Sequence, residues 1–175
     1  MRLRACAFAA VLCFATAAQA GPSDFVPGPL IPEYGRIAAV EGAAPLPESA
    51  RFKVAFDVSE AAAPGEVSRR LESAARFLNM HAAAGVRARN IRLAIVVHGA
   101  AARDLMREPR PSEANANAGL IAALVAHGVD IYLCGQTAAY YDIEAGDLLP
   151  GVRLSLSAMT AHALLQQDGY TLNPS

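Results

Sequence analysis

The chain has 175 residues, of which 54% are hydrophobic and 18% are charged, and its formal net charge is −1. This length is that of one ordinary domain with its own core. No dense basic segment with interleaved aromatic residues occurs, which argues against nucleic acid as a partner. Much of the hydrophobic content is alanine, which suits helices packed tightly over a sheet.

Residues 1–20 have the pattern of a secretory signal peptide. Arg2 and Arg4 precede an apolar stretch, and Ala18-Gln19-Ala20 has the small-x-small form of a cleavage site. We therefore expect cleavage before Gly21 and a periplasmic location. The apolar stretch is shorter than the roughly 20 residues that span a bilayer, so we expect no membrane segment after cleavage.

Residues 21–50 contain six prolines and are predicted to form an arm without a core of its own. We expect this arm to be extended and to pack over the domain or over a neighbouring subunit. The α/β domain is then predicted to occupy residues 51–175.

Strand and helix patterns alternate along this domain. Alternating or continuous apolar runs predict strands over residues 52–58, 91–97, 129–133, 152–156 and 170–172. Helical spacing of apolar residues predicts helices over 67–82, 120–125 and 158–167, with Ser157 as the N-cap of the last. Such alternation implies right-handed crossovers, and it predicts a three-layer α/β/α sandwich with a mainly parallel sheet of about five strands.

His98 and Cys134 each follow a predicted strand and precede a glycine. In open parallel sheets, ligands and reactive groups gather beyond the carboxyl ends of the strands. Cys134 is also the only cysteine outside the predicted signal, where Cys6 and Cys13 lie. An unpaired cysteine in an exported protein is either buried and inert or kept for its reactivity.

The residues after Cys134 favour a reactive thiol. Gly135-Gln136-Thr137 can begin a short helix whose amide groups stabilise a thiolate, lowering its pKa below about 8.5. On neighbouring strands, His98 could pair with the thiolate or shuttle its proton. The alternative is that Cys134 is a small buried hydrophobe and that His98 bonds to backbone.

The remaining polar candidates are rim or capping residues. Gly99, Gly135, Gln136, Thr137 and Asn117 are candidates for substrate contact, and Asn115 or Asn117 could instead cap the second helix. His81 and His162 lie on helices and are predicted to be surface or packing residues. Because no two histidines have metal-ligand spacing, and no nucleotide-binding motif occurs, we expect neither a metal nor another cofactor.

Five segments in a fixed order carry a family resemblance. They cover residues 52–58, 75–79, 94–99, 129–137 and 164–170. Together they resemble the DsrE/DsrF-like proteins, in particular an exported, single-domain branch, over residues 34–174. The resemblance implies an α/β sandwich that assembles into homotrimers or hexamers. It also implies a cysteine that carries sulfur as a persulfide between partner proteins, with Cys134 at that position and His98 at that of the branch's histidine.

The leading hypothesis is a periplasmic sulfur-handling protein in which Cys134 carries or relays sulfane sulfur. Its partners would be a sulfur donor or acceptor protein or a small sulfur compound, and any enzymatic activity would be that of a sulfur carrier or sulfurtransferase-like protein. The alternatives are a non-catalytic oligomeric module that binds a small molecule or partner, and a scaffold with an inert thiol.

Overall fold

The computed structural model describes residues 21–109 and 114–173. The predicted signal peptide therefore lies outside the described residues. A five-stranded parallel sheet has the order β4-β3-β2-β1-β5. Its strands are β1 (Phe52–Val58), β2 (Ile91–Val97), β3 (Asp130–Cys134), β4 (Val152–Ser155) and β5 (Thr171–Asn173).

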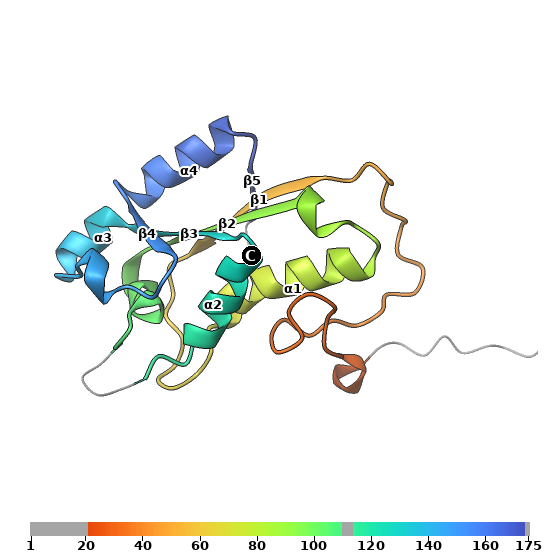
Figure 1. The fold of residues 1–175 in the computed structure, drawn as a ribbon, viewed down its shortest axis with the longest axis horizontal. Coiled ribbons are helices and arrows are strands. Elements are labelled where there is room, and N and C mark those ends of the chain that lie inside the picture. Colours follow the sequence, from red (N-terminus) through yellow and green to blue (C-terminus); the bar gives the residue numbers. More distant parts are fainter. Residues whose placement is uncertain (1–20, 110–113, 174–175) are drawn as a thin grey trace, which may run out of the picture.

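The helices make the other two layers. The model has α1 (Arg69–Ala83), α2 (Ala118–Ala126), α3 (Gly135–Tyr140) and α4 (Ala158–Gln167). Figure 1 shows α1 and α2 below the sheet and α4 above it, with α3 at one end. The predicted three-layer fold and parallel five-stranded sheet are confirmed.

The connectivity explains why α4 lies alone on its face. From β1 to β4 the strands are added in one direction, and the chain then returns from β4 at one edge to β5 at the other. A right-handed crossover in the reverse direction places its helix on the opposite face of the sheet. Helix α4 is that crossover, and it passes over the strands between the two edges (Figure 1).

The two faces of the sheet have unequal cores. Large apolar side chains such as Phe56, Ile95 and Leu133 are buried on the α1 and α2 face. The α4 face has a small cluster instead, consisting of Ala55, Ala94, Val96, Ala161, Leu165 and Tyr170. Helix α4 is therefore held to the sheet by few apolar contacts.

The bounds of β1, β2 and α4 agree closely with the sequence patterns, and Ser157 caps α4 by accepting a hydrogen bond from the amide of Thr160. Helix α1 begins two residues later than predicted, because Ser68 acts as its N-cap and accepts from the amide of Leu71. The 3-10 helix Gly99–Leu105 was not predicted.

No helix among the described residues is long and apolar enough to cross a membrane.

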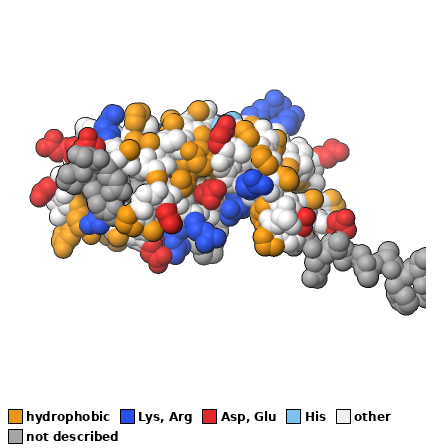
Figure 2. All heavy atoms as spheres, turned by 90° about the horizontal axis from the view of Figure 1, so that it is seen from below, with side chains coloured by type: hydrophobic (Ala, Val, Ile, Leu, Met, Phe, Trp, Pro, Cys, Tyr) orange, Lys and Arg blue, Asp and Glu red, His pale blue; other side chains and the backbone are white. Residues whose placement is uncertain are grey.

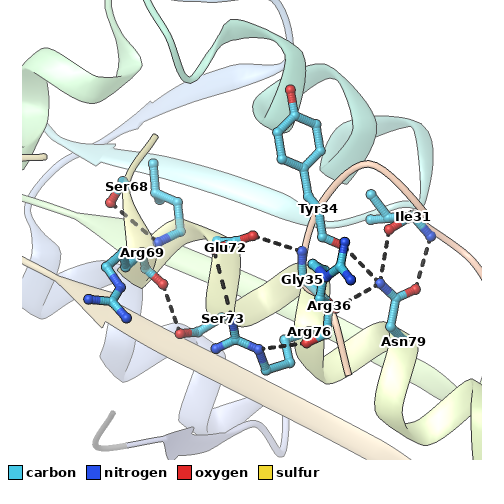
Figure 3. A network of polar contacts seen from close by, with 11 residues as sticks. Ile31, Tyr34, Gly35, Arg36, Ser68, Arg69, Glu72, Ser73, Arg76 and Asn79 are labelled. Carbon is cyan, nitrogen blue, oxygen red and sulfur yellow. Dashed lines mark hydrogen bonds and ion pairs between the residues drawn. The ribbon is translucent and has the colours of Figure 1, made fainter. Parts of the chain in front are cut away.

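The proline-rich arm folds back over α1 of its own chain rather than running extended. The amides of Leu30 and Ile31 donate to the side-chain oxygen of Asn79, at 3.1 and 2.9 Å. The Asn79 side-chain nitrogen lies 2.9 Å from the carbonyl oxygens of Ile31 and Tyr34 (Figure 3). A bridge between Val26 and Ile37 closes this loop.

The arm and the helices beneath it form the face seen in Figure 2, where basic and acidic side chains lie interspersed among hydrophobic ones. Ile31 is only 1% exposed, so the arm contributes to the main core.

Candidate functional site

Cys134 ends β3 and occupies the N-cap position of α3. Its backbone pairs with Ser155 of β4, and its side chain is only 6% exposed. Cys134 is a free thiol among the described residues. Cys134 is therefore buried in the single chain.

The sulfur of Cys134 is surrounded by hydrogen-bond donors. Burial alone would raise the pKa of this thiol. Hydrogen bonds from the amide and the hydroxyl of Thr137, and from the amides of Ala158 and Gln136, outweigh burial and lower the pKa of Cys134 below its ordinary value. Two of these amides belong to α3 and one to α4, so the donor set joins segments more than 20 residues apart in sequence.

Gly135 allows this close arrangement. A Cβ atom at this position would overlap the carbonyl oxygen of Ser155. The glycine therefore lets the start of α3 approach the end of β4, as the sequence suggested. The side-chain amide of Gln136 donates to the carbonyl of Leu156 at 3.3 Å, on the same connection between β4 and α4.

The ends of β2 and β3 lie side by side. Val97, the last residue of β2, pairs with Leu133, and His98 and Cys134 are the next residues along the chain. The amide of Gly99 donates to the hydroxyl oxygen of Thr137 at 3.1 Å. Gly99 has a φ of +57°, a conformation that L side chains rarely adopt. The predicted rim residues Gly99, Gly135 and Thr137 are thus brought to the cysteine.

His98 bonds to a residue that the sequence analysis did not select. Its Nε2 atom lies 3.2 Å from a carboxylate oxygen of Asp57, near the end of β1. The structure thus joins His98 to a side chain, where the alternative expectation was a bond to backbone.

His162 of α4 contacts the other oxygen of the same carboxylate. The distance from His162 Nε2 to Asp57 Oδ1 is 2.7 Å. Burial would raise the pKa of Asp57, but the hydrogen bonds and charges of His162 and His98 hold it below its usual range. His162 is 16% exposed and is therefore a partner of the sheet rather than a surface residue. The sequence signal that could have found Asp57 is its place near a strand's carboxyl end.

Asn117 has a structural partner. Its side-chain oxygen accepts a hydrogen bond from the amide of Ser68 at 2.7 Å, and Asn117 is only 3% exposed. It occupies the N-cap position of α2, but its side chain does not cap the helix. The neighbouring Asn115 accepts from the amide of Asn117 and donates to the carbonyl of Asp104. These asparagines tie α2 to the loop before α1.

His81 packs against aromatic rings, with its ring centre 3.9 Å from that of Phe77, as predicted. No group of three or more His, Cys, Asp or Glu side chains within residues 21–109 and 114–173 could hold a metal ion.

The fold and the strand-end cysteine define a class of parallel α/β domains with a thiol at the carboxyl edge of the sheet. Within this class, the model of the DsrE/DsrF-like family matches residues 53–174. The chain belongs to the DsrE/DsrF-like family.

Two solved structures have the same fold. One is the protein of unknown function MTH1491 from Methanobacterium thermoautotrophicum, which is 20% identical with a TM-score of 0.55, covering 70% of this chain and 97% of that chain. The other is the YchN protein from E. coli, which is 17% identical with a TM-score of 0.52, covering 69% of this chain and 96% of that chain. At these identities the likeness shows the fold alone. No curated protein matches the chain.

Proposed function

We propose that this protein carries sulfane sulfur as a persulfide on Cys134. The observation that carries the proposal is the set of donors around the sulfur, contributed by Gln136, Thr137 and Ala158. Such a set stabilises an anion on sulfur, whether thiolate or persulfide. The chain belongs to the DsrE/DsrF-like family. The resemblance to this family implies sulfur relay, which supports the same chemistry.

The proposed step is a sulfur transfer in which atoms and electrons balance. The Cys134 thiolate attacks a sulfane sulfur of a polysulfide, a new S–S bond forms, and the S–S bond of the donor breaks. The shortened polysulfide leaves with the electron pair of the broken bond. An acceptor thiolate then attacks the outer sulfur of the Cys134 persulfide and releases the Cys134 thiolate. His98, which Asp57 holds at the end of the neighbouring strand, takes the proton when the thiol ionises.

Mass spectrometry of the mature protein after incubation with polysulfide tests this proposal. We expect an added mass of about 32 Da, that of one sulfur atom, on Cys134. The matched control is Cys134→Ser, which should gain nothing. A wild-type thiol that is alkylated but never gains sulfur would overturn the carrier and favour the non-catalytic binding module. A folded protein with no alkylation at all would favour the scaffold.

We also propose that the protein is exported to the periplasm, on the basis of the signal pattern in residues 1–20. In mass spectra of a periplasmic extract, the mature chain should begin at or near Gly21. A protein that retains Met1 would contradict export.

We propose that the mature chain forms a homo-oligomer, either a trimer or a hexamer. On the α4 side of the domain, large apolar side chains are exposed, namely Met159 and Leu164 of α4 and Leu172 of β5. Exposed apolar side chains gathered in one region favour a protein interface.

A further inference from the structure

The start of α4 covers Cys134, and one helical turn later α4 contacts the sheet a second time. The amide of Ala158, the first residue of α4, lies at the Cys134 sulfur and is one of the groups that lower the pKa of this thiol. His162 follows Ala158 by four residues, and its Nε2 atom bonds to Asp57 at 2.7 Å. These two contacts fix α4 over β3 and over β1 respectively.

We propose that Asp57 and His162 are positioning residues, which hold α4 so that its first amide stabilises the Cys134 thiolate and its start covers the sulfur. This inference rests on the proposed function only in taking Cys134 as the reacting group. Neither residue touches the sulfur in the described contacts, so both act through the elements that they hold in place.

The weak apolar attachment of α4 makes this polar contact important. The buried apolar residues of α4 are Ala161 and Leu165, whereas Met159 and Leu164 are 79% and 60% exposed. A helix held by so little apolar surface depends on its remaining contacts for an exact position. The bond from His162 to Asp57 joins α4 to a strand of the main sheet, within one turn of the Ala158 amide.

Asp57 is itself fixed from two sides. His98 occupies one carboxylate oxygen at 3.2 Å, and His162 occupies the other at 2.7 Å. His98 leads into Gly99, whose amide donates to Thr137, and Thr137 donates to the sulfur. The Asp57 carboxylate is therefore connected to Cys134 by two routes, one through α4 and one through the end of β2.

His162 is suited to a test by substitution, because the Nδ1 atom of its ring is buried without a hydrogen-bond partner. Replacing the ring with leucine removes this unpaired polar atom together with the bond to Asp57, and it keeps apolar bulk in place. Asp57 is 40% exposed, so water can solvate the carboxylate oxygen that loses its partner. We therefore expect His162→Leu to fold.

The experiment measures the rate of Cys134 alkylation by iodoacetamide as a function of pH in the mature full-length chain. The midpoint of the pH profile reports how well the thiolate is stabilised, and the limiting rate at high pH reports access to the sulfur. For His162→Leu we expect a midpoint raised by about half a unit to one unit and a limiting rate several-fold above that of wild type. His162→Gln, whose side-chain amide can donate to Asp57, should restore most of both values.

Gln166→Ala is the control on α4, because Gln166 lies on the same helix and its side chain is exposed. It should leave both values unchanged. If folded His162→Leu has the midpoint and the limiting rate of wild type, the proposal is overturned. If circular dichroism shows that His162→Leu does not fold, Asp57→Ala gives the same test, because it removes the carboxylate that both histidines contact.

The sulfur-carrier proposal and the positioning proposal can be overturned independently of each other. A wild-type protein that gains no sulfur from polysulfide overturns the carrier, while the effect of His162 on alkylation still decides the positioning role.

Discussion

The hydroxyl oxygen of Thr137 accepts a hydrogen bond of 3.1 Å from the amide of Gly99, and the same hydroxyl is one of the groups that lower the pKa of the Cys134 thiol. A hydroxyl group has one proton and two lone pairs. With the Gly99 amide on the oxygen, the hydroxyl proton is free to be donated to the sulfur when the thiol ionises. Thr137 therefore connects the end of β2 to the thiol that follows β3.

Thr137→Val should raise the pKa of Cys134 by about one unit, because valine keeps the shape of the side chain and removes the donated hydrogen bond. The pH dependence of iodoacetamide labelling measures this pKa. Thr137→Ser retains the hydroxyl and should keep the wild-type midpoint. Equal midpoints in the valine and serine variants would show that the hydroxyl does not stabilise the thiolate.

Much of the fold was predictable because its strands are apolar runs and its helices have periodic apolar faces. Residues 91–97 show this most plainly, since the run is buried in the centre of the sheet and its bounds agree with β2. The position of Cys134 at a strand end was predictable for the same reason.

The partners of His98 could not be predicted from spacing. Asp57 lies 41 residues before His98, and His162 lies 105 residues after Asp57. Asp57 falls on a strand whose alternation is explained equally well by a solvated face. The order of the strands in the sheet decides which helix crosses that face. Apolar periodicity in the sequence does not specify this order. The same is true of Ala158, whose amide reaches the sulfur only because α4 crosses over from β4.

Asn79→Ala should destabilise the protein by about 2 kcal/mol or more, because backbone groups of the arm lose their partners when the side-chain amide is removed. Asn79 is fully buried and bonds to the backbone of Ile31 and Tyr34 (Figure 3). It also accepts from the amide of Leu30. Urea unfolding measures the loss, and limited proteolysis should cleave the arm faster in the variant.

Ser73→Ala is the matched control for this prediction, because Ser73 lies on the same helix and bonds only to the carbonyl of Arg69 on an exposed side. It should change the free energy of unfolding by no more than about 0.5 kcal/mol. If Asn79→Ala were as stable as Ser73→Ala, the arm would not contribute to the stability of the domain.

Asp104 should increase the free energy of unfolding as the pH falls. This is the opposite of the usual effect of a carboxylate in a folded protein. Burial raises its pKa more than the hydrogen bonds from the amide of Ala62 and from Ser68 lower it. A raised pKa means that the folded state binds the proton more tightly than the unfolded state does. As the pH falls through this raised pKa toward the ordinary value of about 4, Asp104 therefore adds stability.

The comparison with Asp104→Asn isolates this contribution. Wild type should gain free energy of unfolding relative to the variant as the pH is lowered from 7 toward 4, as measured by urea unfolding at each pH. Asp57, whose pKa is lowered, has the opposite sign, and its contribution is present above pH 4 and lost as the pH falls further. A difference between wild type and Asp104→Asn that shrinks on acidification would contradict the raised pKa.

The mature chain should have the mass of a trimer or a hexamer in light scattering at micromolar concentration. The exposed apolar side chains Met159 and Leu164 of α4 are expected to lie in the contact, because they are 79% and 60% exposed in the single chain. Met159→Glu with Leu164→Glu should shift the mass toward that of a single chain, since charged side chains are depleted from the cores of interfaces. The control is Met80→Glu, which places a glutamate on an exposed apolar position of α1, on the opposite face of the sheet. A wild-type protein with the mass of a single chain would contradict the oligomer. A double variant that stays fully assembled would place the contact on another surface than α4.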